Sequence, residues 1–161
     1  MAGTHTAASD IHPVQRRAAA PPAALDLLGQ ARAGLEEART LETPNERYAL
    51  AHLAALRTAA AVLAVHGRPE ATPRKRRQIR SAWEVLPEVA PELTEWSALF
   101  AAGAARRARA EAGIRGAASN RDADDLVRDV TMFLGLVERL LVPRPPLPRP
   151  RSRRSGTDRT N

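Results

Sequence analysis

The chain has 161 residues and a formal net charge of +7, with 33 alanines, five aromatic residues and no cysteine. This length fits one domain with extended ends, since typical domains span roughly 100–150 residues. The lack of cysteine excludes a disulfide scaffold, a cysteine-ligated zinc site and a thiol nucleophile. Abundant alanine and scarce aromatic residues favour closely packed helices over a β-sandwich.

Two long helices are predicted in the first half of the chain. The first begins near Pro22, a residue type suited to the first helical turn, and ends near Thr40. Thr43 and Glu46 have capping-box spacing, so a second helix should follow and end at Gly67. Its apolar stripe is predicted to consist of Ala49, Leu53, Leu56, Ala60, Leu63 and Ala64.

A short helix is predicted around Ile79, Trp83 and Leu86. Pro87 and Pro91 should end it, because proline lacks the backbone N–H that continues a helix.

Two longer helices complete the predicted fold. One should start at Pro91 and stop at Gly113, and the other should follow a cap at Ser119 and end at Pro143. Together the five elements predict an all-α, up-and-down bundle of four main helices and one short helix. We expect three parts, which are a disordered head at residues 1–21, a helical domain at 22–142 and a disordered Pro/Arg-rich tail at 143–161.

We expect a soluble, cytoplasmic protein. No run approaches the roughly 20 apolar residues that span a bilayer, so no contact with a membrane is predicted. Arg16 and Arg17 resemble a twin-arginine export signal, but Pro21, Pro22 and Asp26 interrupt the apolar region that should follow.

The positive charge is concentrated in two segments. The tail has six arginines against Asp158, and residues 68–80 have six cations against Glu70, so each carries +5. The rest of the helical domain is acidic, which is unlike a DNA-binding domain with one coherent basic face. A phosphate-binding or RNA-binding role is predicted for one stretch within residues 68–80, which consists of Arg74, Lys75, Arg76 and Arg77.

Charged residues also border the predicted apolar faces. Arg57 and Arg107 lie on the apolar sides of their helices, so we predict that they form structural ion pairs with Asp122 and Asp129. A divalent cation held by Asp122, Asp125 and Asp129 is conceivable, but no acidic residue elsewhere completes the site. We therefore predict no metal and no cofactor.

Three stretches resemble the small HEPN (higher eukaryotes and prokaryotes nucleotide-binding) domains, in particular an uncharacterised actinobacterial branch. They are LLGQARAGLEEA at residues 27–38, ERYALAHLAALR at 46–57 and ADDL at 123–126. The resemblance extends over residues 22–142 and implies a bundle of four or five helices that forms a homodimer.

The resemblance also implies a candidate catalytic pair. Many HEPN domains are metal-independent ribonucleases whose signature is an arginine and a histidine with four to six residues between them, and two copies of this pair meet across a dimer. Arg47 and His52 fit that spacing, although Tyr48 stands where such enzymes usually have a polar residue. From the residues alone, the pair is interpreted as a half-buried histidine beside a solvated arginine, because the two positions differ by about 140° around a helix.

Two functions therefore remain open. The first is a non-catalytic module that dimerises and associates with a nucleotide, RNA or a protein partner. The second is a toxin-like endoribonuclease, in which His52 acts on the 2′-hydroxyl or the leaving group and Arg47 stabilises the phosphate.

Overall fold

The structure, a computed structural model, describes residues 19–67 and 80–143, and these ranges contain helices and no strand. The predicted all-α fold class is therefore confirmed. Most of the predicted head and tail lies outside the described residues, as do Ile79 and the basic stretch Arg74, Lys75, Arg76 and Arg77. The described elements are α1 (Pro22–Thr40), α2 (Pro44–His66), α4 (Ala82–Val89), the 3-10 turn η1 (Pro91–Leu93), α5 (Thr94–Glu111) and α6 (Asn120–Leu141).

Side-chain caps fix the start of three helices. The Thr43 hydroxyl accepts a hydrogen bond from the backbone N–H of Glu46 at 3.4 Å, and Ser119 forms a complete capping box. Both caps are predicted from the sequence, whereas a third, at Ser81, is not. After α5 the chain reverses through Gly113, whose φ of +71° is the left-handed conformation expected at that position.

Pro87 lies inside α4, so the prediction that it ends this helix is wrong. A proline leaves the carbonyl group four residues earlier, here on Trp83, without its helical partner. The Ser97 hydroxyl of α5 donates a hydrogen bond to this buried carbonyl at 2.5 Å. A neighbouring helix thus satisfies the group that Pro87 leaves unpaired, and α4 continues to Val89.

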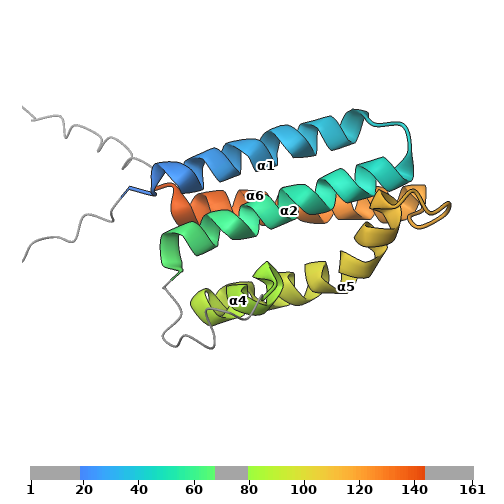
Figure 1. The fold of residues 1–161 in the computed structure, drawn as a ribbon. Helices are drawn as coiled ribbons and strands as arrows, with labels where there is room; N and C mark the ends of the chain where they lie inside the picture. The colour runs from blue at the N-terminus through green and yellow to red at the C-terminus, as the bar shows by residue number, and fades with distance from the viewer. Residues whose placement is uncertain (1–18, 68–79, 144–161) are drawn as a thin grey trace, which may run out of the picture.

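The four long helices alternate in direction, and α2 lies at the centre of the bundle (Figure 1). Helices α1 and α6 pack against one side of α2, and α4 and α5 pack against the other. The backbones of α5 and α6 both pack on α2 and make little contact with each other. An opening between α5 and α6 is therefore built into the arrangement.

Small side chains allow this crowding around α2. The predicted stripe is wrong, because Leu53, Leu56 and Leu63 are only partly buried and Ala64 is exposed. Alanines on the other sides are fully buried, since they let neighbouring backbones approach closely. The buried residues of α2 are Tyr48, Ala51, His52, Ala54, Ala55, Thr58, Ala59, Ala61 and Val62.

Helix α2 is also long and apolar enough to span a membrane, with a mean hydropathy of 1.6 over its most apolar window. Arg47 and Arg57 interrupt any continuous apolar run in its sequence, so no membrane span is predicted there. Half of that window is buried inside the protein. The central position of α2 therefore accounts for its composition.

Aromatic rings join the two sides of the bundle. Phe100 of α5 lies 5.1 Å from Phe133 of α6 and 5.2 Å from Trp83 of α4, measured between ring centroids. Trp96 lies 5.5 Å from Phe133. This aromatic cluster of Trp83, Trp96, Phe100 and Phe133 links α4 and α5 to α6, across the space between the backbones of α5 and α6.

Replacing Phe133 by alanine should therefore destabilise the protein strongly. Phe133 is 0% exposed, so Phe133→Ala is expected to cost about 3–5 kcal/mol of unfolding free energy in urea titrations. The neighbouring Met132 is 55% exposed, and Met132→Ala should change this free energy by less than about 0.5 kcal/mol. Equal losses in the two variants would contradict the assigned role of the cluster.

Candidate functional site

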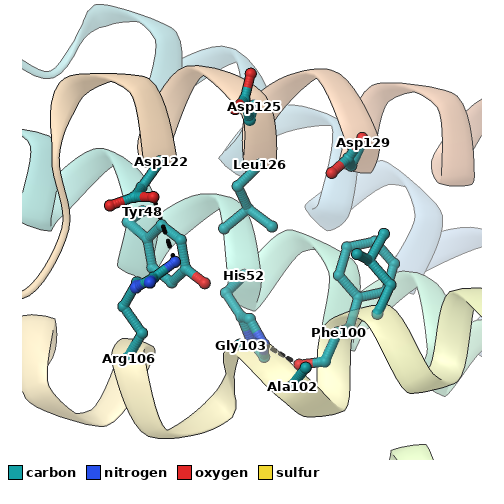
Figure 2. Close-up of a pocket in the computed structure, with 11 residues that line it drawn as sticks. Tyr48, His52, Phe100, Ala102, Gly103, Arg106, Asp122, Asp125, Leu126 and Asp129 are labelled. Atoms are coloured by element: carbon teal, nitrogen blue, oxygen red, sulfur yellow. Dashed lines mark hydrogen bonds and ion pairs between the residues drawn. The ribbon is translucent and has the colours of Figure 1, made fainter.

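A cleft with a volume of about 280 Å³ lies between α5 and α6, and α2 forms its floor. Figure 2 shows Arg106 and Asp122 at one end, and Phe100 and Asp129 at the other. We call it the α5–α6 cleft. It is lined by Tyr48, His52, Leu99, Phe100, Ala102, Gly103, Arg106, Asp122, Asp125, Leu126 and Asp129.

His52 is buried in the floor of the cleft, with 1% of its surface exposed. Its Nε2 lies 2.9 Å from the carbonyl oxygen of Phe100, so Nε2 carries the proton and donates it. The ring forms T-shaped pairs with Trp83 and Phe100, with ring centroids 5.9 and 6.3 Å apart. Burial is the main reason that the pKa of His52 is lowered, so the imidazole is neutral at pH 7.

This environment leaves His52 without a group free for acid–base chemistry. Nε2 is engaged by the Phe100 carbonyl, and Nδ1 is buried with no hydrogen-bond partner among the described residues. A general acid or base must come within hydrogen-bond reach of the substrate proton. The sequence interpretation of His52 as half-buried is thus wrong, because α4 and α5 cover the side of α2 that carries it.

Arg47 faces the start of α6 and takes no part in the cleft. Its guanidinium group pairs with the carboxylate of Asp124 and donates a hydrogen bond to the backbone carbonyl of Asn120 at 3.3 Å. The side chain is 16% exposed, which corrects the expectation that this arginine is solvated. Arg47 and His52 therefore serve different contacts within one chain, as their angular separation on α2 predicts.

Asn45 reinforces the contact that Arg47 makes. Its side-chain amide donates to the carbonyl of Ile114 at 2.9 Å and accepts from the N–H of Ala118 at 3.0 Å. These bonds attach the connection between α5 and α6 to the first turn of α2. The position of α6, and with it the width of the cleft, depends on this region.

Asp122 closes one end of the cleft. Its carboxylate accepts a hydrogen bond from the backbone N–H of Ser119 and lies 3.3 Å from the guanidinium of Arg106. The two hydrogen bonds with Ser119, followed by the charges of Arg106 and Arg121, lower the pKa of Asp122. The negative charge of Asp122 is therefore already compensated by Ser119 and Arg106, and the residue has a structural role.

The predicted partners of the aspartates are not the observed ones. Arg106, and not Arg107, faces Asp122, while Arg107 binds Glu111 within α5 at 2.8 Å. Arg57 points toward α1, where a Cβ added to Gly34 would lie 3.3 Å from its guanidinium. The guanidinium of Arg57 therefore lies against α1, and none of the described aspartates of α6 forms an ion pair with it.

Asp129 is half-buried at the other end of the cleft, and none of the described cations forms an ion pair with it. Burial and then the nearby charge of Asp125 raise the pKa of Asp129, although Arg128 opposes this shift. Asp125 itself pairs with Arg128 at 2.9 Å and Arg121 at 3.7 Å. The part of the chain that the structure describes holds no group of three potential metal ligands, so the alternative of a cation held by these aspartates has no support there.

The residues that shape the cleft are not predicted from the sequence. Tyr48 is buried beneath Arg106, whose guanidinium carbon lies 5.8 Å from the centre of the tyrosine ring. A Cβ added to Gly103 would lie only 2.6 Å from the Tyr48 hydroxyl oxygen. The sequence does contain one signal for this contact, which is the single glycine in the alanine-rich α5. An isolated glycine in a helix often marks a place where another group comes close to the backbone.

Residues 38–138 of the chain match the sequence model of the SAV_6107-like HEPN family. The matched stretch includes α2, α5 and nearly all of α6, and therefore every residue that lines the cleft. No curated protein and no solved structure matches the chain.

Two glycines provide a matched test of the packing in the cleft. Gly103→Ala places a Cβ against the Tyr48 hydroxyl and should reduce the free energy of unfolding by about 1–3 kcal/mol. Gly29→Ala meets no atom within 4 Å and should add about 0.5–1 kcal/mol, because alanine favours a helix. Stabilisation by both substitutions in thermal or urea unfolding would refute the close approach.

The buried His52 should make stability depend on pH. Its folded-state pKa lies below 6.5, so the unfolded chain binds the proton first, and stability decreases as pH falls below about 6.5. Urea titrations at pH 7.5 and 5.5 should show this loss in the wild type and in His66→Gln, and a smaller loss in His52→Gln. The raised pKa of Asp129 has the opposite effect, because the folded protein binds this proton first and gains stability as pH falls. All three proteins retain Asp129, so it does not affect the comparison. An undiminished loss in His52→Gln would assign the effect to other groups.

Proposed function

The chain belongs to the SAV_6107-like HEPN family. We propose that it does not cleave RNA and acts instead by binding a partner. In this proposal it is a non-catalytic helical module that forms a homodimer. The observation that carries the proposal is the burial of His52, whose Nε2 is bound to the carbonyl of Phe100.

The alternative is a metal-independent endoribonuclease that uses Arg47 and His52. In its favour is the spacing of four residues between them. Against it, a histidine that is 1% exposed would have to leave its hydrogen bond and its aromatic neighbours to reach a 2′-hydroxyl. Arg47 would also have to leave Asp124, the anion that compensates its charge.

The surface of the described residues favours a protein partner, in particular a second copy of the chain. Twelve arginines stand against fifteen acidic residues in these ranges, and this net charge of −3 does not attract the phosphates of nucleic acid to this part of the chain. Several large apolar side chains are 44–55% exposed, and a partner would cover them. They are Leu25, Leu99, Ile114, Met132, Leu140 and Val142.

A cleavage assay tests the proposal. The full chain, incubated with labelled single-stranded RNA at pH 7 in the presence of a chelator, should leave the RNA intact. The variants His52→Ala and Arg47→Ala should behave like the wild type, and a HEPN ribonuclease of known activity serves as the positive control. Light scattering on the same sample should give the mass of a dimer, about twice 17.4 kDa.

The opposite result is equally clear. RNA cleavage by the wild type that is lost in His52→Ala and retained in His66→Ala would establish the ribonuclease. Because His52→Ala removes a buried ring, its folding must be confirmed by circular dichroism before a loss is interpreted. A monomer at all concentrations would overturn the proposed dimer.

A further inference from the structure

Among the described residues, one carboxylate in the α5–α6 cleft, that of Asp129, has no cation to compensate its charge. Asp122 is paired with Arg106, and Asp125 is paired with Arg128 and Arg121. Asp129 has no ionic partner among the described residues. Figure 2 shows its carboxylate directed toward the space between α5 and α6. A half-buried carboxylate in such a place favours a positively charged ligand.

Tyr48 supplies a second, independent observation. The residue is 4% exposed and lines the cleft, and no described residue forms a hydrogen bond with its hydroxyl. In Figure 2 this hydroxyl lies between Gly103 and Leu126 and points into the cleft. The hydroxyl oxygen itself is accessible from the cleft, so it can pair with a polar group of a ligand.

Part of each wall of the cleft is apolar. Leu99 and Ala102 of α5 line one side, and Leu126 of α6 lines the other. These apolar parts suit an aliphatic chain. A volume of about 280 Å³ lies below the usual range for drug-sized ligands, so it suits a group the size of one side chain.

We propose that the α5–α6 cleft binds an alkyl guanidinium or alkyl ammonium group. The carboxylate of Asp129 is the counterion, and the hydroxyl of Tyr48 accepts a hydrogen bond from an N–H of the ligand. The aliphatic part lies between Leu99 and Leu126. Arg106 does not oppose the ligand, because Asp122 already balances its charge.

Two sources can supply this chemistry. One is a free alkyl cation, and the other is an arginine of residues 144–161, a segment that follows α6 directly and has six arginines. Asp129 lies twelve positions before Leu141, which corresponds to about 18 Å along the helix. An extended chain covers that distance in about six residues at 3.1 Å each, so arginines from Arg149 onward are within reach. Tethering also gives them an effective concentration in the millimolar range.

The test uses n-butylguanidinium as the probe and n-butylurea as its uncharged isostere. The full, isotope-labelled chain is titrated with each compound at pH 7, and the shifts of backbone amide signals are followed by NMR. The guanidinium compound should give a saturable shift of the amides that line the cleft, and the urea compound should give none.

Substitutions identify the groups that bind. Asp129→Asn should weaken binding of n-butylguanidinium at least tenfold, since it removes the counterion. Tyr48→Phe keeps the ring and should weaken binding about two- to tenfold through the loss of one hydrogen bond. Glu37→Gln, on the exposed side of α1, removes one negative charge away from the cleft and should leave the affinity unchanged.

A third titration distinguishes the two sources. In a chain with the six arginines of residues 144–161 replaced by glutamine, the probe should bind more tightly if these arginines occupy the cleft. An unchanged affinity assigns the cleft to a free alkyl cation.

Three results would overturn the proposed site. They are the absence of a saturable shift, equal binding of n-butylurea, and an undiminished affinity in a folded Asp129→Asn protein. The inference does not depend on whether the chain cleaves RNA, because its readout is binding of a small cation. Its failure is therefore distinguishable from a failure of the proposed function.

Discussion

The close approach of other helices to α2 is the constraint on which the rest of this structure depends. A helix that is contacted on both sides by neighbouring helices needs small side chains where their backbones come near. Alanines provide this along α2, and Thr58 is buried among them with its hydroxyl bonded to the carbonyl of Ala54 at 2.9 Å. The larger leucines are left on the sides of α2 that the neighbours cover less well.

The cleft follows from this arrangement. Because α5 and α6 both pack on α2, their backbones remain apart, and side chains must bridge the space between them. The aromatic cluster does so at one end through the contact of Phe100 with Phe133, and the Arg106–Asp122 ion pair does so at the other. Between these two bridges Tyr48 and Asp129 keep polar atoms without a partner among the described residues. The same packing thus creates the cleft and leaves its unpaired groups.

The family of this protein and the contacts of its candidate catalytic residues support different conclusions. The match over residues 38–138 establishes a HEPN domain. The Arg47–His52 spacing agrees with the catalytic pair that the sequence resemblance implies. The contacts of both residues are structural, since Arg47 binds the start of α6 and His52 binds the backbone of α5. A spacing rule records positions along a helix, whereas catalysis requires atoms that a substrate can reach.

The sequence by itself determined the helices, because their start and stop signals are local. Thr43, Ser119 and Gly113 each act on backbone groups within a few residues, and the predicted bundle of helices follows from them. Tertiary structure decided which side of α2 is buried, where Pro87 is tolerated and which arginine meets Asp122. Each of these outcomes depends on a partner distant in sequence, such as Ser97 for the carbonyl that Pro87 leaves free. Periodicity describes one helix at a time, so it contains no information about which neighbour faces each side.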